Sequence, residues 1–174
     1  SVVYGAGAGT HLPLLVSVVA TAPPGDVLEC GAGHFSSPVL SMLCHAIGRK
    51  LISLEQPGPW YDALDDLVFD HDSHVRVEVG PDRWIEVAEK IIYANTVSIA
   101  VAFVDHGLYD KDRLDMVKLL KEKNAPLIVV HGTRNPWLTE TDKALDAFKY
   151  RFDYTLMSPV TTVVSDTIDV SCFD

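Results

Sequence analysis

Short apolar runs recur along the chain, separated by stretches in which apolar residues follow helical spacing. Gly, Pro, Asp or Ser bound most runs, which is typical of buried strands. These runs lie at residues 27–30, 51–54, 75–79, 97–104 and 127–130. The stretches between and after them predict helices at residues 36–47, 61–69, 84–92, 110–120 and 139–150. Asp110 is a candidate cap for the fourth of these helices, and Thr139 with Asp142 resembles a capping box for the fifth.

Both ends of the chain depart from this alternation. Residues 11–22 predict a short apolar helix, which ends before two prolines and a glycine. Residues 152–156 and 162–170 predict two strands whose link is too short for a parallel crossover, so we expect an antiparallel hairpin. We therefore expect a single domain over residues 1–174. It comprises a leading helix and linker (1–25), strand-helix units (26–150) and a C-terminal hairpin (151–174).

This order of elements predicts an α/β fold, with an open, mostly parallel sheet covered by helices on both faces. In such sheets, ligands bind beyond the carboxyl ends of the strands, near the switch in strand order. Candidate functional residues are therefore expected at the strand ends, which are residues 29–34, 55–60, 80–82, 105–107 and 131–133.

Composition narrows the range of partners. The net charge is −10, with 24 acidic and 14 basic residues and no acidic tail, so we expect no nucleic-acid partner and favour a small polar or cationic ligand. The apolar run at residues 12–22 is too short to span a bilayer and lacks the preceding positive charges of a signal peptide, so no membrane contact is expected. Three cysteines without Cys-x-x-Cys spacing favour a reducing, cytoplasmic location.

The loop after the first strand discriminates between two cofactors. A dinucleotide fingerprint has a third glycine where this chain has Ser36. Glu29, just before the loop, suits a cationic ammonium or sulfonium group better than a pyrophosphate. Both features favour S-adenosylmethionine over NAD. Glu55 ends the second strand and could accept hydrogen bonds from both ribose hydroxyls, and Asp82, after the third strand, could accept one from an adenine amino group.

Leu28-Glu29-Cys30-Gly31-Ala32-Gly33, Glu55 and Val104-Asp105-His106 resemble the successive motifs of class I S-adenosylmethionine-dependent methyltransferases. The resemblance covers nearly the whole chain. Residues 9–15, 104–106, 129–131, 148–154 and 161–165 further resemble a group of small bacterial methyltransferase-like proteins of unassigned substrate. The fold that this implies is a Rossmann-like, seven-stranded sheet whose last strand is inserted antiparallel.

The resemblance also implies roles for individual residues. Glu29, Gly31, Ala32 and Gly33, with His34 beside them, would hold the methionine portion of the cofactor. Glu55 would bind the ribose, Gln56 or Trp60 would flank the adenine, and Asp82 would meet its edge. Asp105 and His106 would lie nearest the transferred methyl group.

Histidines at three strand ends raise the question of a base or a metal ion. His34, His106 and His131 are expected at one edge of the sheet together with Asp105, a set that could serve as a general base or bind a divalent metal. We take Asp105, His106 and His131 as catalytic candidates, and Asp105 has a rival role as a structural carboxylate. A metal is not favoured, because Gly132 stands where the similar bacterial proteins have an aspartate.

The function expected from the sequence is methyl transfer from S-adenosylmethionine to an unidentified small-molecule acceptor, with S-adenosylhomocysteine as the product. The acceptor is expected under the loops near His11, Tyr109 and Trp137, or in a site closed by a partner subunit, such as a homo-oligomer. The alternative is a catalytically inactive protein of the same fold that binds the cofactor or a protein partner. An NAD-linked oxidoreductase is a third hypothesis, disfavoured by Glu29 and Ser36.

Overall fold

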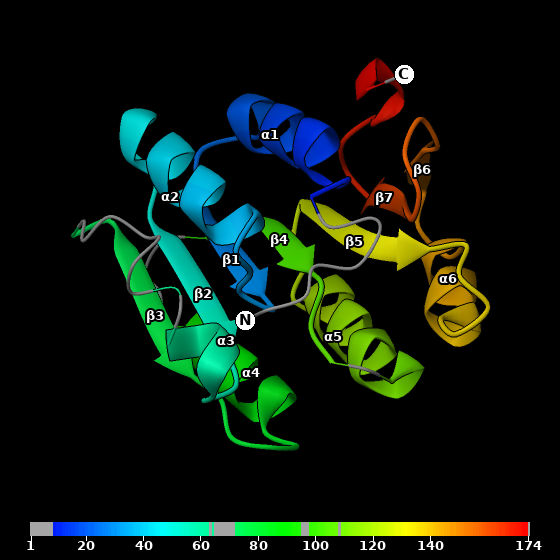
Figure 1. Cartoon of the computed structure of the whole chain (residues 1–174). Coiled ribbons are helices and arrows are strands. Elements are labelled where there is room, and N and C mark those ends of the chain that lie inside the picture. The colour runs from blue at the N-terminus through cyan, green and yellow to red at the C-terminus, as the bar shows by residue number, and fades with distance from the viewer. Residues whose placement is uncertain (1–8, 63, 65–71, 95–97, 108, 174) are drawn as a thin grey trace.

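A computed structural model of the chain describes residues 9–62, 64, 72–94, 98–107 and 109–173. Its strands form one seven-stranded sheet in the order β3-β2-β1-β4-β5-β7-β6 (Figure 1). The strands are β1 (Asp26–Cys30), β2 (Leu51–Glu55), β3 (His74–Glu78), β4 (Ile99–Val104), β5 (Leu127–Thr133), β6 (Tyr150–Tyr154) and β7 (Val160–Ser165). Only β7, between β5 and β6, pairs antiparallel. The expected sheet with an antiparallel last strand is confirmed.

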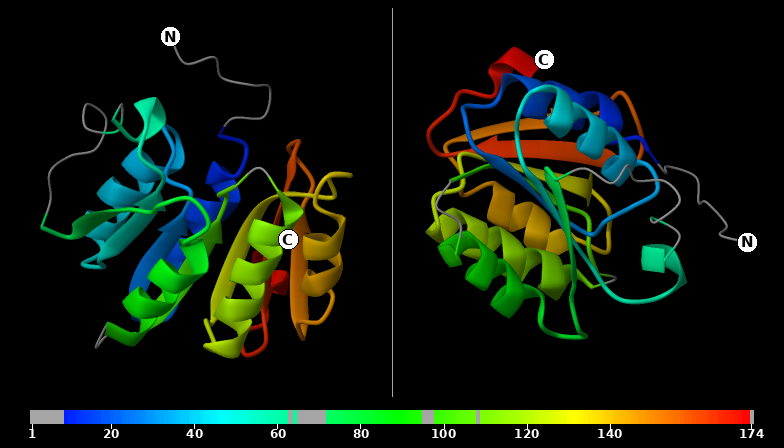
Figure 2. Two further views of the ribbon diagram at one scale, coloured as in Figure 1. Left: turned by 90° about the horizontal axis from the view of Figure 1, so that it is seen from below. Right: turned by 90° about the vertical axis from the view of Figure 1, so that its left-hand side faces the viewer.

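Helices cover both faces of the sheet (Figures 1 and 2). They are α1 (Leu12–Thr21), α2 (Ser36–Ala46), α3 (Pro59–Asp62), α4 (Trp84–Ala94), α5 (Asp110–Glu122) and α6 (Thr139–Leu145), followed by the short 3-10 helix η1 (Ser171–Phe173). The helix predicted at residues 61–69 falls largely on residues 63 and 65–71, outside the described part of the chain. No described helix is both long and apolar enough to cross a membrane.

The core consists of two apolar layers, one on each face of the sheet. Helices α1 and α2 pack on one face, where Phe103 of β4 is fully buried, and α4, α5 and α6 pack on the other. All five residues of β1 and all six of β4 are buried, because parallel strands at a sheet centre are covered from both sides. Trp84 of α4 is buried in the second layer, with 6% of its surface exposed.

The N-terminus of α6 is capped from outside the helix. Thr139 and Asp142 form no capping box; instead the carboxylate of Asp110 accepts hydrogen bonds from the backbone N–H groups of Glu140 (2.7 Å) and Thr141 (2.9 Å). Asp110 therefore does not cap its own helix, α5, whose N-cap makes no side-chain hydrogen bond. The caps expected within each helix were wrong, because a carboxylate can satisfy orphan N–H groups of any helix that lies within reach.

Helix α6 also ends earlier than predicted. Its last residue is Leu145, and the predicted extension to residue 150 was wrong. The chain leaves the helix because the N–H of Lys149 donates to the carboxylate of Asp166 (2.9 Å) and Tyr150 pairs with Ser165 in β7. Hydrogen bonding to the sheet thus replaces the last turn that the sequence pattern predicts.

The ends of β1 and β4 approach each other at a glycine. Gly31 has φ of +96°, and a Cβ atom placed on it would lie 2.6 Å from the carbonyl carbon and oxygen of Asp105. The N–H of Asp105 in turn donates to the carbonyl of Cys30 (2.8 Å). Only glycine fits here, so Gly31 fixes where β4 ends relative to β1.

We expect Gly31→Ala to lower the free energy of unfolding by roughly 2–5 kcal/mol, because strain at positive φ adds to a backbone clash. Gly48→Ala is the matched control: Gly48 has φ of +70°, and a Cβ there would have no neighbour within 4 Å. Its cost should be limited to the strain of the left-handed backbone, roughly 1–2 kcal/mol. Urea unfolding measures both variants, and equal losses would contradict the role of the close approach.

Candidate functional site

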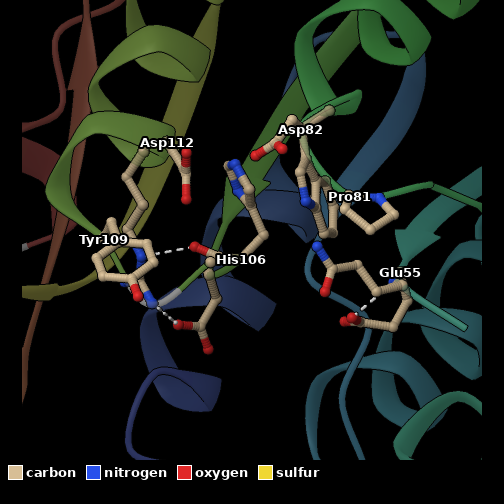
Figure 3. Close-up of a pocket in the computed structure, with 11 residues that line it drawn as sticks. Glu55, Pro81, Asp82, His106, Tyr109 and Asp112 are labelled. Carbon is tan, nitrogen blue, oxygen red and sulfur yellow. Dashed lines mark hydrogen bonds and ion pairs between the residues drawn. The ribbon is translucent and has the colours of Figure 1, made fainter. Parts of the chain in front are cut away.

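A pocket of about 490 Å³, hereafter the larger pocket, lies at the carboxyl ends of β2, β3 and β4. Its lining residues are Glu55, Gln56, Pro81, Asp82, Trp84, Asp105, His106, Gly107, Tyr109, Asp112 and Arg113. Figure 3 shows Glu55 and Asp82 on one side of this space, facing Tyr109 and Asp112 across it. The volume is in the range of small-molecule sites, and the position is the one that the strand order predicts.

Glu55 is the acidic side chain that β2 presents to the larger pocket. Its Oε1 accepts a hydrogen bond from the N–H of Gln56 (2.7 Å). Burial is the main cause that raises the pKa of Glu55 to about 7; the charges of Glu29 and Asp105 add to the shift, and that hydrogen bond opposes it. The carboxylate is therefore easily protonated, and a ligand that donates hydrogen bonds to it would favour its ionised form.

Glu29, by contrast, lies inside the protein. Its side chain is fully buried, and the hydroxyls of Ser37 and Ser53 donate to its Oε2 at 2.8 and 2.5 Å. Burial raises the pKa of Glu29 to about 7, although these hydroxyls oppose the shift. In this conformation the carboxylate links the end of β1 to Ser37 of α2 and Ser53 of β2, and it is separated from solvent.

The backbone N–H groups of the glycine loop already donate to acceptors within the protein. The N–H groups of Gly31 and Ala32 both donate to the carbonyl of Leu54, at 3.0 and 3.1 Å, and that of Gly33 donates to Ser37 Oγ (2.9 Å). The predicted cofactor residues thus fall into two groups. Glu55, Gln56, Asp82 and Asp105 line the larger pocket, whereas the described lining includes none of Glu29, Gly31, Ala32, Gly33 and His34. The side chain of Trp60 lies outside the described part of the structure.

Arg113 of α5 joins the ends of two strands, a role that the sequence analysis missed. Its Nε donates to the carbonyl of His106 (2.9 Å), its Nη1 to the carbonyl of His131 (2.5 Å) and its Nη2 to Oδ1 of Asp105 (3.0 Å). Burial raises the pKa of Asp105, and the charge of Arg113 opposes that shift. The only signal in the sequence was a basic residue in the first turn of the helix that follows Asp105.

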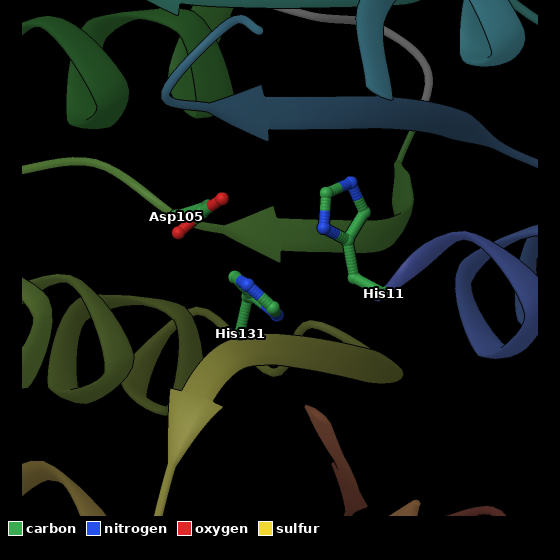
Figure 4. Close-up of side chains that lie close together, drawn as sticks. All are labelled: His11, Asp105 and His131. Carbon is green, nitrogen blue, oxygen red and sulfur yellow. The ribbon is translucent and has the colours of Figure 1, made fainter. Parts of the chain in front are cut away.

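Three side chains from distant segments converge beside this arginine. His11, just before α1, Asp105, after β4, and His131 in β5 point toward one another (Figure 4), and one ligand atom of each lies within 4.8 Å of the others. The expected convergence of His34, His106 and His131 with Asp105 was therefore wrong in part. Of the three histidines only His131 belongs to this group, and His11 completes it, because α1 crosses the sheet near β4 and β5.

His106 occupies a different position from the other two. Its ring packs on Trp84, with 4.4 Å between centroids, and is only 2% exposed. Burial and the nearby charge of Arg113 lower its pKa to about 3, so the imidazole is neutral at neutral pH. His106 stays a predicted catalytic residue, and it is one of the residues that line the larger pocket.

A second, smaller pocket of about 270 Å³ adjoins the larger one. Its lining residues are Asp105, Gly107, Arg113, His131, Gly132, Asn135, Trp137, Leu138 and Pro159. Asp105, Gly107 and Arg113 belong to both pockets. Two ligands bound in the two spaces would therefore meet at Asp105, which is the arrangement needed for transfer of a group between them.

Comparison with known proteins supports the fold. No protein-family model matches the sequence, and no curated protein sequence matches it. Among solved structures, the O-methyltransferase TomG from Streptomyces achromogenes, involved in tomaymycin synthesis and solved in complex with S-adenosylmethionine, superposes with a TM-score of 0.64 at 16% identity. The match covers 94% of this chain and 81% of TomG.

Two further solved structures are similar. A human methyltransferase 10 domain containing protein gives a TM-score of 0.57 at 9% identity, with 96% of this chain and 85% of that chain covered. A putative S-adenosylmethionine-dependent methyltransferase from Streptococcus mutans gives 0.53 at 13% identity, with 87% and 46% covered. At these identities the likeness shows that the chain has the class I methyltransferase fold.

We expect Glu29→Gln to change how stability depends on pH. The pKa of Glu29 rises from 4.5 to about 7 on folding, so the folded state binds the extra proton between these values. Its contribution to stability is present below pH 4.5 and is lost as pH rises to 7, by an amount on the order of 3 kcal/mol. Between pH 4.5 and 7, the free energy of unfolding of the glutamine variant should therefore rise relative to that of wild type.

Denaturant unfolding at several pH values measures this difference. Glu122→Gln is the control, because it removes an exposed carboxylate, and its difference from wild type should stay nearly constant. A flat difference for Glu29→Gln would mean that Glu29 is ionised throughout this pH range.

Proposed function

We propose that this protein is an S-adenosylmethionine-dependent methyltransferase that acts on a small-molecule acceptor. The observation that carries the proposal is the pairing of Glu55 and Asp82 on one pocket, at the ends of adjacent strands of a sheet with the methyltransferase strand order. Carboxylates at these two places can accept hydrogen bonds from a ribose and from an adenine amino group. The solved complex of TomG with S-adenosylmethionine supports the same cofactor.

The larger pocket would hold the nucleoside portion of the cofactor. In this proposal Glu55 accepts hydrogen bonds from the ribose hydroxyls, Asp82 meets the adenine edge, and Gln56 and Pro81 lie beside the base. The methionine portion would extend from the ribose toward the loop at residues 31–33 and toward Asp105. Negative side chains near this path suit the positive sulfonium and ammonium groups.

The smaller pocket would hold the acceptor. It shares Asp105 and Arg113 with the larger pocket, and Trp137, 78% exposed, and Leu138 supply apolar surface. A space of about 270 Å³ suits a small molecule rather than a macromolecular segment. The exposed indole gives such an acceptor a surface on which to stack.

Methyl transfer in this arrangement would need little beyond alignment and exclusion of water. A lone pair of the acceptor forms a bond to the methyl carbon while the carbon–sulfur bond breaks, and its electrons remain on sulfur to give neutral S-adenosylhomocysteine. A proton lost from the acceptor passes to Asp105 or His131, the titratable carboxylate and imidazole that line the smaller pocket. Holding both reactants across a shared wall supplies most of the rate enhancement.

Isothermal calorimetry tests the cofactor directly. We expect S-adenosylmethionine and S-adenosylhomocysteine to bind with one site per chain and NADH not to bind, because Ser36 stands in place of the third glycine of the dinucleotide pattern. Formation of S-adenosylhomocysteine with a mixture of candidate acceptors would then demonstrate transfer. Binding without turnover would favour the alternative, an inactive protein that senses the cofactor, and loss of both ligands would overturn the proposal.

The role of Glu55 has its own test. If its ionised form binds the ribose, affinity for S-adenosylhomocysteine should fall as pH drops through about 7, by roughly tenfold between pH 8 and pH 6. Glu55→Gln should weaken binding about 10–100-fold at pH 8 and flatten this profile. Glu122→Gln, on the exposed surface of α5, should leave affinity and profile unchanged. Unchanged affinity in Glu55→Gln would remove Glu55 from the site.

A further inference from the structure

His11 has two buried ring nitrogens without a hydrogen-bond partner. The side chain is 5% exposed, and both Nδ1 and Nε2 lack a partner in the described structure. Its ring packs against Phe103 and His131, with centroid distances of 5.0 and 4.8 Å, so the imidazole is held in place by packing alone. Leaving a buried polar group unpaired destabilises the folded state, which argues against a purely structural role for this histidine.

His131 is oriented by a hydrogen bond on its other nitrogen. Its Nδ1 lies 3.0 Å from Oγ1 of Thr161 on β7. When Nδ1 carries the proton and donates to this hydroxyl, Nε2 keeps a free lone pair. Histidine ligands of metal ions are typically oriented by such a bond on the second nitrogen.

Asp105 is oriented in the same way. Its Oδ1 accepts a hydrogen bond from Arg113, at 3.0 Å, and Oδ2 is then the oxygen that could bind another group. The arginine is itself fixed by the carbonyls of His106 and His131, so it cannot easily leave the carboxylate. Each of the two groups that faces His11 therefore has one atom bound by the protein and one to spare.

We infer that His11, Asp105 and His131 form a binding site for a divalent transition-metal ion, and that Zn²⁺ or a similar imidazole-binding ion is its ligand. Two imidazoles and one carboxylate make up a common ligand set for such ions, and it leaves coordination positions open. The carboxylate is already paired with Arg113, which reduces the negative charge that Mg²⁺ or Ca²⁺ would need. The site should therefore discriminate against these harder ions.

The three ligand atoms would need to move only slightly closer together to bind one ion. Ligand atoms around a zinc ion, with bonds of about 2.0–2.2 Å, lie about 3–4 Å apart. The present separations reach 4.8 Å, so side-chain movements of about 1 Å would complete the site.

Because Asp105 and His131 line the smaller pocket, the open coordination positions of the ion would face the space proposed for the acceptor. The ion would then bind an acceptor oxygen and favour its deprotonation, a step that rests on the proposed function.

Metal titration of the full chain tests the site without any methyl transfer. After removal of metals with a chelator, Zn²⁺ and Co²⁺ should bind with one ion per chain and micromolar or lower dissociation constants, whereas Mg²⁺ should bind at least 100-fold more weakly. The bound Co²⁺ should also give visible absorption bands of a low-coordinate nitrogen–oxygen site. Calorimetry and absorption spectra record these outcomes.

His11→Phe separates metal binding from folding. Phenylalanine keeps a ring against Phe103 and removes the two unpaired nitrogens, so the midpoint of thermal unfolding without metal should equal or exceed that of wild type. Zn²⁺ affinity should fall about 100-fold or more, and His131→Phe should lower it to a similar degree. His45→Ala, which removes an exposed histidine on α2, should leave the affinity unchanged.

Two results would overturn the inference. Zn²⁺ and Co²⁺ could fail to bind below millimolar concentration, or they could bind equally well to wild type and to His11→Phe, which would place the ion elsewhere. Titration with S-adenosylhomocysteine distinguishes this failure from that of the proposed function. Cofactor binding without metal binding would leave the methyltransferase proposal standing, and metal binding without cofactor binding would leave the metal site alone.

Discussion

The contact between Gly31 and the backbone of Asp105 is the constraint on which the rest of the site depends. It brings the ends of β1 and β4 closer than any side chain at position 31 would allow. Asp105 is thereby held at the centre of the sheet edge, where Arg113 can reach it together with the carbonyls of His106 and His131. Both pockets are built around that carboxylate, so their relative position follows from one close backbone approach.

The second constraint on the site is the burial of three carboxylates near one another. Glu29, Glu55 and Asp105 lie close enough to influence one another, and burial is the leading cause of the raised pKa of each. Serine hydroxyls stabilise Glu29 and the guanidinium of Arg113 stabilises Asp105, whereas backbone N–H groups, those of Gln56 and Ala32, stabilise the ionised form of Glu55. Glu55 and Asp105 both line the larger pocket, and Glu55 is the one without a cationic partner there, so hydrogen bonds from a ligand can favour its ionised form.

The sequence predicts the sheet well because strands buried on both faces must be apolar along their whole length, as β1 and β4 are. It also places Glu55 and Asp82 together, since parallel strands end at one edge. What it does not predict are contacts between segments far apart in the chain. The pairing of His11 with His131, the reach of Arg113 to two strands and the capping of α6 by Asp110 all depend on how helices pack across the sheet. No local pattern encodes these distances.

The two pockets lie on opposite sides of Asp105, and their walls carry different functional groups. On the side of β2 and β3 the walls carry the carboxylates of Glu55 and Asp82, and on the side of β5 they carry an imidazole, a guanidinium and exposed apolar surface. His11 lines neither of these two pockets, but it faces Asp105 and His131, because α1 packs over β4. A ligand on one side can therefore change without altering the walls of the other. The fold fixes where the two pockets lie, but the side chains in each wall decide what can bind there, so function resides in the site rather than in the fold.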